Sequence, residues 1–229
     1  MTGLVTGVGV VSAWLVGEVS SHALARLSGT LDAEERRRAA RLPSSAARRR
    51  FVIAHGALRQ IVAERLGAPP ADLTWKTGPN GKPELAGEWT GIHANLSHSG
   101  DRCLIAVSAQ RAVGADIQRL IPGLNVAAMA RRYFPQAEAR QVADADADAD
   151  AETFARLWAR KEAVTKAGGA RLTQVLPLLT PEGPVAALGS WYRVADVDAP
   201  PGFRAAVALA GADRFAVEMG EWAMNEWAP

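Results

Sequence analysis

Apolar residues recur with a helical period over residues 46–66 and alternate with polar residues in several shorter runs. In the longer segment the apolar positions keep a spacing near 3.6 residues until Gly67, which predicts one long helix. Ser44 or Ser45 can cap its first turn. Arg49, Arg50 and Arg59 project from the other faces of this helix.

Other helices are indicated by capping and helix-breaking residues. Asp32 with Glu35 three residues later has the form of a capping box, which predicts a helix over 33–42. Pro43 ends that helix because proline cannot continue a helical hydrogen-bond pattern. Two more helices are expected, one near residues 125–133 and one from about residue 152 to the glycine pair at 168 and 169.

Strand-like runs make up most of the remaining chain. They are expected near residues 10–16, 92–98, 103–109, 112–118, 172–179, 189–194, 203–209 and 214–220. Residues 77–85 are rich in proline, asparagine and glycine and favour tight bends.

The order of these elements is strand, helices and strands, and then strand, helices and strands again. It predicts an α+β protein built from two similar α+β halves related by a pseudo-two-fold, each an antiparallel sheet with packed helices. We place the boundary so that residues 1–112 form the N-terminal half and residues 113–229 form the C-terminal half.

Composition is that of an ordinary globular protein, with 229 residues of which 48% are hydrophobic and 22% charged. The single cysteine, Cys103, excludes an internal disulfide and a multi-cysteine metal site, which suits a reducing compartment. The apolar stretch 4–16 lacks a preceding lysine or arginine, as a signal peptide would have, and no run reaches the ~20 apolar residues of a membrane span. We therefore expect a cytoplasmic protein without a membrane segment.

Positive charge is unevenly placed although the formal net charge is only +2. The arginines at 36–38, 41 and 48–50 form a cluster that suits phosphates or an acidic protein surface; two solvated helix faces would give the same pattern. No interleaved aromatic residues or recognition-helix signature accompany the cluster, so a nucleic-acid partner is not expected. The acidic repeat at 144–151 is expected to be a solvated, flexible loop.

Two polar groups stand at the ends of expected strands. Ser97 and His98 precede a turn, where the histidine can donate to a phosphate or serve a structural hydrogen bond. Asp116 and Gln118 alternate around Ile117 and therefore point to the same side of a strand. Oxygen ligands of this kind suit Mg²⁺, although a solvated edge-strand aspartate would look the same in sequence.

A third polar group lies on the last expected helix. Trp158, Glu162 and Lys166 follow one another at intervals of four residues and form a row on one face, with Lys161 beside the row. A surface helix with an ordinary Glu–Lys pair, closed by Gly168 in the left-handed conformation, is the simpler interpretation.

Taken in order, these groups resemble the motifs of phosphopantetheinyl transferases. The stretch GADIQ, followed later by WARKEAVTKAGG, is similar to the paired signature of that family, and RRRFVIAHGALR, NGKP and NLSHSGD are similar to its three upstream motifs. The resemblance covers about residues 31–172. Length and the two-half layout are similar to those of the larger, pseudo-dimeric, monomeric branch. Within that branch, the chain most resembles the type that serves secondary-metabolite synthases for polyketides and nonribosomal peptides.

The resemblance implies a magnesium-dependent transfer of the 4'-phosphopantetheine arm of coenzyme A to a serine of an apo acyl or peptidyl carrier protein, with release of adenosine 3',5'-bisphosphate. It also implies roles for single residues. Asp116 and Glu162 would hold the metal, Glu162 would also accept the serine proton, and Lys166 would compensate charge on the departing phosphate. Lys161 would support the pyrophosphate, Ser97 and His98 would contact phosphates, Lys82 and Pro83 would lie along the adenine, and Arg38, Arg49 or Arg50 would reach the 3'-phosphate.

One position departs from the pattern, because many family members carry glutamate where this chain has Gln118. An amide oxygen can still coordinate Mg²⁺ or hold one of its waters, so we expect weaker metal binding with catalysis retained. The alternative function is a module that binds coenzyme A or a carrier protein without turnover. The potential base and both lysines, at 161 and 166, argue against that alternative.

Overall fold

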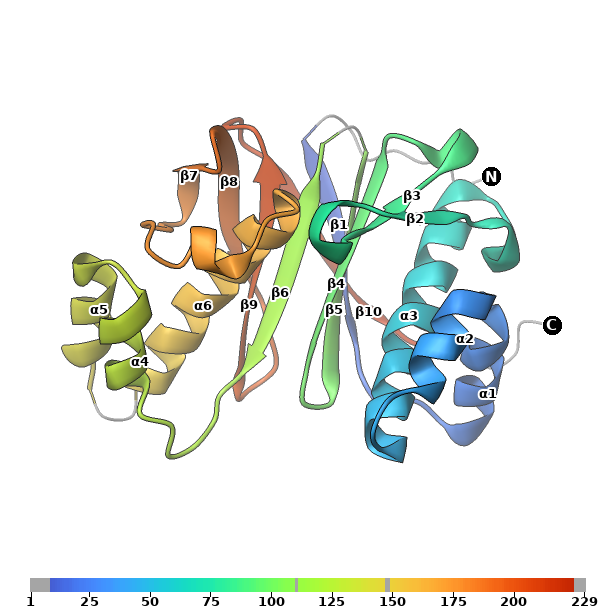
Figure 1. Ribbon diagram of the computed structural model, residues 1–229, viewed down its shortest axis with the longest axis horizontal. Helices are drawn as coiled ribbons and strands as arrows, with labels where there is room; N and C mark the ends of the chain where they lie inside the picture. The colour runs from blue at the N-terminus through green and yellow to red at the C-terminus, as the bar shows by residue number, and fades with distance from the viewer. Residues whose placement is uncertain (1–8, 110, 147–148, 225–229) are drawn as a thin grey trace.

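Two four-stranded sheets, each covered by helices on one side, form the body of the protein (Figure 1). The computed structural model describes residues 9–109, 111–146 and 149–224. The helices are α1 (Ser21–Thr30), α2 (Ala33–Ala40), α3 (Ser45–Leu66), α4 (Val126–Tyr133), α5 (Gln136–Ala143) and α6 (Asp150–Ala167). The strands are β1 (Val10–Val16), β2 (Trp75–Thr77), β3 (Pro83–Leu85), β4 (Ile92–Ser99), β5 (Arg102–Ala109), β6 (Val113–Arg119), β7 (Gly183–Ala187), β8 (Ser190–Val197), β9 (Phe203–Ala210) and β10 (Ala216–Trp222).

The strands are ordered β10-β1-β5-β4 in the first sheet and β6-β9-β8-β7 in the second, and β2 and β3 form a separate hairpin. The predicted α+β class is confirmed. Neighbouring strands are antiparallel except β1 and β10, which run parallel. The expected strand near 214–220 therefore exists but belongs to the first sheet rather than to that of the C-terminal half. The boundary between residues 112 and 113 and the pseudo-two-fold stay predictions.

Alternating side chains give each sheet two apolar faces. In β5, Leu104 and Ala106 pack with residues of β6 and β9, and this cluster joins the two sheets. The intervening Ile105 and Val107 pack against α3 instead. In β9, Ala206 and its alternating neighbours pack against α6 in the same way. Burial on both faces explains why these strands read as nearly continuous apolar runs.

Helix ends follow the capping residues in the sequence. Ser44 caps α3 by accepting a hydrogen bond from the backbone of Ala47, and Gly67 ends it in the left-handed conformation with φ 64°. Asp32 and Glu35 form the predicted capping box of α2. Helices α1 and α5 were not predicted, because each has only eight to ten residues and few buried positions.

Three local expectations were wrong. Residues 172–179 do not form a strand: Leu172–Gln174 is a 3-10 helix, and Pro177 cannot donate to a sheet. The acidic repeat at 144–151 is not a loop to its end, because the last helix, expected from near residue 152, begins at Asp150; residues 147 and 148 of the repeat lie outside the described part. Gly168 keeps helical angles, and Gly169 with φ 58° is the left-handed residue.

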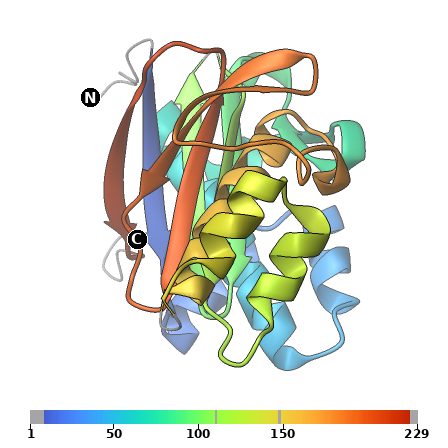
Figure 2. The same ribbon diagram turned by 90° about the vertical axis from the view of Figure 1, so that its left-hand side faces the viewer.

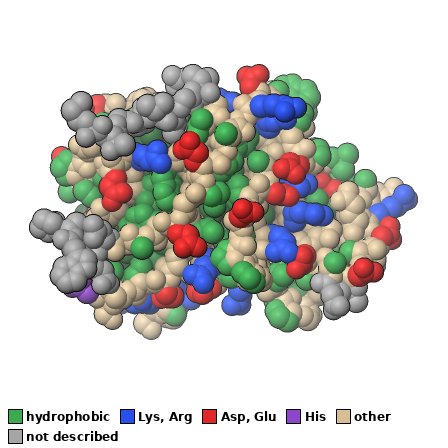
Figure 3. All heavy atoms as spheres, turned by 180° about the vertical axis from the view of Figure 1, so that it is seen from behind, with side chains coloured by type: hydrophobic (Ala, Val, Ile, Leu, Met, Phe, Trp, Pro, Cys, Tyr) green, Lys and Arg blue, Asp and Glu red, His purple; other side chains and the backbone are tan. Residues whose placement is uncertain are grey.

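Helix α6 covers one face of the second sheet, with α4 and α5 outside it (Figures 1 and 2). Helices α1, α2 and α3 lie on the outer side of the first sheet (Figure 1). On the face turned away from the viewer in Figure 1, acidic and basic groups are interspersed among apolar side chains (Figure 3). In the part of the chain that the structure describes, no helix is both long and apolar enough to cross a membrane.

Candidate active site

The candidate site lies where the two sheets meet. Strands β4 and β6 are the edge strands of their sheets and run side by side, and α6 packs against β6 (Figure 1). A cavity of about 340 Å³ opens at this junction. It is lined by Leu96, Ser97, His98, Asp116, Ile117, Gln118, Trp158, Glu162 and Lys166. The structure therefore brings together residues from all three polar groups of the sequence.

Asp116 is the most enclosed polar residue of the cavity, with 4% of its surface exposed. Its Oδ1 accepts hydrogen bonds from Ser97 Oγ and from Lys166 Nζ, each at 2.6 Å. Its Oδ2 is buried and has no hydrogen-bond partner among the described residues. Since an unpaired buried carboxylate oxygen is costly, this atom marks a position where a further cation or donor would be stabilised.

Glu162 lies one helical turn before Lys166 on α6 and faces the same cavity. Burial raises the pKa of its carboxyl; Lys166 opposes this shift, and Asp116 adds to it as a like charge. A carboxylate with a raised pKa binds a proton more readily, which suits a general base.

A close approach between β6 and α6 allows these side chains to meet. A Cβ atom at Gly114 would lie 2.0 Å from the carbonyl oxygen of Ala163 and 2.4 Å from the backbone nitrogen of Ala167. Only glycine therefore permits this separation. The same contact lets Lys166 donate to the carbonyl of Ala115 at 3.2 Å as well as to the neighbouring aspartate.

The donor set fits Mg²⁺. Asp116 and Glu162 supply two carboxylates and Gln118 an amide oxygen, all on the wall of one cavity. Mg²⁺ normally takes one or two protein carboxylates and completes its shell with water and substrate phosphate. Among the described residues, no group of three or more His, Cys, Asp or Glu side chains could hold a metal. These residues therefore suit a hard ion whose coordination shell is completed by water and substrate, rather than an ion that is held by protein ligands alone.

His98 lines the same cavity as the two carboxylates and lies near several cationic side chains. Burial lowers its pKa most, and Lys166, Arg50 and His55 lower it further. A mostly neutral imidazole donates one N–H to an anion, and the nearby cations favour negative charge. The surroundings of His98 thus suit a phosphate group.

The three candidate arginines have different surroundings. Arg38 lies over the ring of Phe51, 5.4 Å from its centroid. Arg49 is paired with Glu18 at 2.9 Å. Arg50 lines a small hollow together with His98. Of the three, Arg50 is the one that shares a concave surface with His98.

Lys161 does not join this group. Its side chain is fully buried and its Nζ lies 2.5 Å from Glu138 Oε2 on α5. The ammonium also donates to the carbonyl of Leu178 and lies 4.9 Å from the centroid of Phe134. This environment differs from the expected contact with a pyrophosphate, because the charge is already paired inside the second half.

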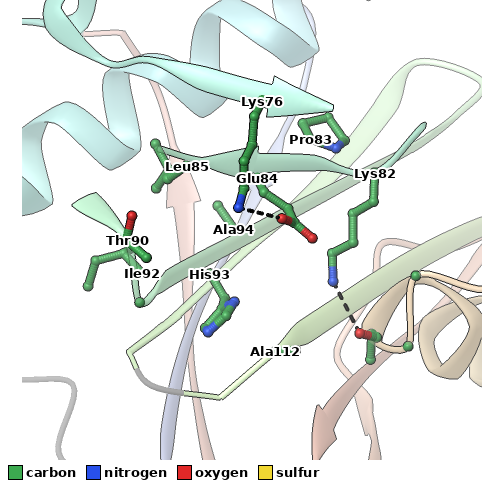
Figure 4. A pocket seen from close by; sticks show the side chains of 14 residues that line it. Lys76, Lys82, Pro83, Glu84, Leu85, Thr90, Ile92, His93, Ala94 and Ala112 are labelled. Carbon is green, nitrogen blue, oxygen red and sulfur yellow. Dashed lines mark hydrogen bonds and ion pairs between the residues drawn. The ribbon is translucent and has the colours of Figure 1, made fainter. Parts of the chain in front are cut away.

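Lys82 and Pro83 line a second cavity of about 320 Å³ between the β2–β3 hairpin, β4 and the end of α6 (Figure 4). The Lys82 ammonium donates to the carbonyls of Val113 at 3.1 Å and Ala167 at 3.2 Å. Burial lowers its pKa, and Glu84 opposes that shift. Lys82 therefore fixes the carbonyl end of α6 while its stem and Pro83 form the cavity wall.

Several residues of this region had no predicted role, although Asn95 belongs to the polar stretch at the end of its strand. His93 lines the second cavity, and Asn95 accepts a hydrogen bond from the backbone of Ala115 at 2.9 Å. Both lie on the same side of β4 as Ser97 and Ser99, so the alternation along the strand was an available signal. Glu138 had no such signal, because its partner Lys161 is reached only through the fold.

Comparison with known proteins agrees with the motifs. A model of the 4'-phosphopantetheinyl transferase superfamily matches residues 112–185. The 4'-phosphopantetheinyl transferase HetI of Nostoc sp. is 34% identical over 163 residues, which are 69% of this chain and 69% of HetI. The Synechocystis sp. protein slr0495 is 34% identical over 152 residues, 64% of this chain and 62% of that protein. The 4'-phosphopantetheinyl transferase AcpT of Escherichia coli K12 is 35% identical over 99 residues, 43% of this chain and 50% of AcpT.

Proposed function

Because the chain belongs to the 4'-phosphopantetheinyl transferase superfamily, we propose that it transfers the 4'-phosphopantetheine arm of coenzyme A to a serine of an apo acyl or peptidyl carrier protein. In this reaction the serine oxygen forms a bond to the phosphorus next to pantetheine. The bond from that phosphorus to the bridging oxygen breaks, and adenosine 3',5'-bisphosphate leaves. The observation that carries the proposal is the buried Asp116, whose Oδ2 has no hydrogen-bond partner in the described part of the chain and which lines one cavity with Glu162 and Lys166.

Mg²⁺ is proposed as the ion held by Asp116 and Glu162, with Gln118 as a direct or water-mediated ligand. When bound, it would neutralise charge on the pyrophosphate during transfer. The unpartnered Asp116 Oδ2 and the oxygen-only donor set support this assignment. Ser97 and Lys166 both bind Asp116 Oδ1 and leave Oδ2 available.

Glu162 is proposed to accept the proton of the carrier serine, directly or through a water molecule. Its raised pKa supports this role, since burial and the neighbouring Asp116 make the carboxylate more basic. Lys166, on the next turn of α6, would compensate negative charge on the leaving phosphate.

The nucleotide is proposed to extend from this centre along the junction of the sheets. The cavity beside Lys82, Pro83 and His93 would take the adenine, and its volume suits a heterocyclic base. Arg50 and His98 would bind a phosphate, for which a guanidinium fork beside a neutral imidazole is a suitable pair of donors.

The carrier protein is proposed to be acidic and to dock beside the site, over the arginines that α2 exposes. Arg36, Arg37 and Arg38 lie on the exposed side of that helix. Charge complementarity of this kind speeds association more than it strengthens binding. Reversing the charge of Arg37 and Arg38 should then slow transfer without weakening the binding of coenzyme A.

Intact-protein mass spectrometry of an apo carrier incubated with the protein, coenzyme A and Mg²⁺ tests the function. We expect the carrier to gain one phosphopantetheine group, and the gain to disappear on chelation and in Glu162→Ala. Binding of coenzyme A without any mass change on several carriers would contradict the proposal and support a binding module without turnover. In that case Gln118→Glu would be the first variant to measure.

A further inference from the structure

Strand β6, which carries the metal-binding candidate Asp116, is an edge strand of its sheet and lies beside the edge strand of the other sheet. On one side β6 is paired with β9 along Val113–Arg119. On the other side it faces β4, yet β4 and β6 terminate separate sheets. The position of the aspartate relative to β4 is therefore not set by a backbone ladder, which elsewhere fixes the register of neighbouring strands.

Side chains occupy this edge in place of a strand. The carbonyl of Val113 accepts from Lys82, and the carbonyl of Ala115 accepts from Lys166. The backbone N–H of Ala115 donates to Asn95 Oδ1, and that of Arg119 donates to Ser99 Oγ. These bonds connect β6 to the β2–β3 hairpin, to β4 and to α6, which are the elements that build the candidate site.

Asn95 is the enclosed member of the set on β4. It is 7% exposed, and its Oδ1 lies 2.9 Å from the backbone nitrogen of Ala115, the residue directly before Asp116. The residues lining the two cavities include its neighbours Ala94 and Leu96 but not Asn95 itself. Its side chain is thus committed to the β6 backbone and does not face either cavity.

We propose that Asn95 is a positioning residue for the reaction: its hydrogen bond to Ala115 holds β6 in place against β4, so that Asp116 meets Ser97, Lys166 and Glu162. The inference rests on the proposed function, and it adds a residue that touches neither coenzyme A nor the metal. Because a displacement of about 1 Å in a catalytic group can cost a hundredfold in rate, one backbone contact beside the carboxylate is sufficient for such a role.

The test compares three variants of the full-length protein. Asn95→Leu keeps the volume of the side chain and removes the acceptor, whereas Asn95→Asp keeps an acceptor oxygen in the same place. Ser99→Ala is the matched control, because it removes the other hydrogen bond between a β4 side chain and the β6 backbone, at Arg119, three residues beyond Asp116. Each variant is measured for kcat, for the Mg²⁺ concentration that gives half the maximal rate, and for coenzyme A affinity.

We expect Asn95→Leu to lower kcat about tenfold to a hundredfold and to raise the Mg²⁺ requirement, with coenzyme A affinity changed by less than about twofold. Asn95→Asp should recover most of the lost rate, and Ser99→Ala should keep the wild-type kcat and Mg²⁺ requirement. A wild-type rate and Mg²⁺ requirement in Asn95→Leu would overturn the proposal. Equal losses in Asn95→Leu and Ser99→Ala would also overturn it, because the effect would then belong to the whole junction.

Amide hydrogen exchange separates this inference from the proposed function. In the wild-type protein the Ala115 N–H should be protected, and in Asn95→Leu it should exchange at least about tenfold faster while the β6 amides bonded to β9 stay protected. Hydrogen exchange does not depend on transfer activity. The mass shift of the carrier with the wild-type protein tests that activity separately. Unchanged protection of Ala115 would overturn the inference. If Asn95→Leu does not fold, Asn95→Ala is measured in the same way.

Discussion

Lys161 and Glu138 form a fully buried ion pair on the side of α6 that faces away from the candidate site, with Nζ and Oε2 2.5 Å apart. Glu162, the next residue along α6, faces the cavity. The adjacent lysine and glutamate of the motif therefore serve opposite sides of one helix. Glu138 also accepts from the backbone N–H and the hydroxyl of Thr180, so the pair ties α5, α6 and the following loop together.

The buried ion pair predicts that removing one partner destabilises the protein more than removing both. Lys161→Met alone should lower the free energy of unfolding by about 3–5 kcal/mol, because it leaves a buried charge unpaired. Adding Glu138→Gln removes that charge and keeps an acceptor for Thr180, so the double variant should regain much of the loss. Thermal and denaturant unfolding measure both variants.

The same double variant should bind coenzyme A nearly as well as the wild-type protein. If instead stability returned while the affinity for coenzyme A stayed low, Lys161 would contact the ligand, as the resemblance implied. The measurement is a binding titration with coenzyme A on the folded double variant.

The row Trp158, Glu162 and Lys166 could be read from the sequence because helical spacing alone determines it. The direction of Lys161 could not, because it depends on a carboxylate that is 23 positions away and lies on a helix the pattern did not reveal. Local chemistry likewise predicted the caps of α2 and α3 but misassigned the left-handed glycine. A Cβ at Gly168 would lie 2.4 Å from Leu188 Cδ1, so a larger residue there would displace this side chain, a long-range contact that the local sequence does not reveal.

Long-range pairing was the other part that the sequence could not supply. The run that forms β10 looked like one more strand of the C-terminal half, and its alternation was consistent with either sheet. In the structure Ala216 pairs with Val10 in a parallel arrangement, more than two hundred residues away along the chain. No local signal distinguishes such partners, whereas the antiparallel pairing of β4 with β5 follows from a short turn.

The raised pKa of Glu162 predicts that both stability and activity depend on pH. Its pKa is raised from the ordinary 4.5 by burial, so ionisation disfavours the folded state, and stability should fall as pH rises through the folded-state pKa. Glu162→Gln should therefore raise the melting temperature of the metal-free protein at pH 8 and change it less at pH 4. Calorimetry at both pH values measures this difference.

Activity should show the opposite trend, since a general base works only when it is deprotonated. The value of kcat/KM should therefore fall at low pH, where Glu162 takes up a proton. A kcat/KM that stays constant as the pH falls, or an equal change in melting temperature at both pH values in Glu162→Gln, would contradict the assignment.

Gly114→Ala tests the close approach of β6 to α6. The added methyl group would meet the backbone of Ala163 and Ala167, which cannot move without shifting α6. We expect a loss of about 1–3 kcal/mol in the free energy of unfolding, together with a large loss of transfer activity. Gly29→Ala in α1 is the matched control, because nothing lies within 4 Å of its added Cβ. Equal stability of the two variants would show that β6 and α6 can separate without cost.

Gln118→Glu tests whether this position lies near the metal. A third carboxylate should lower the Mg²⁺ concentration needed for half the maximal rate by about tenfold, corresponding to ~1.4 kcal/mol. Gln141→Glu adds the same charge at an exposed position on α5 and should leave the Mg²⁺ dependence unchanged. Steady-state rates across a Mg²⁺ titration measure both variants, and identical titrations for Gln118→Glu and the wild-type protein would place Gln118 away from the metal.

Lys82→Met tests whether the hairpin lysine stabilises the protein without any nucleotide. Its ammonium satisfies the carbonyls of Val113 and Ala167, so removing it should cost about 1–3 kcal/mol in the free energy of unfolding. Lys76→Met removes an exposed lysine of the same hairpin, whose ion pair with Glu84 at 3.4 Å is worth about 0–1 kcal/mol. Denaturant unfolding of both variants without coenzyme A measures the difference. If Lys82→Met were as stable as Lys76→Met, the lysine would not hold the end of α6, and any effect on coenzyme A affinity would come from the cavity that Lys82 lines.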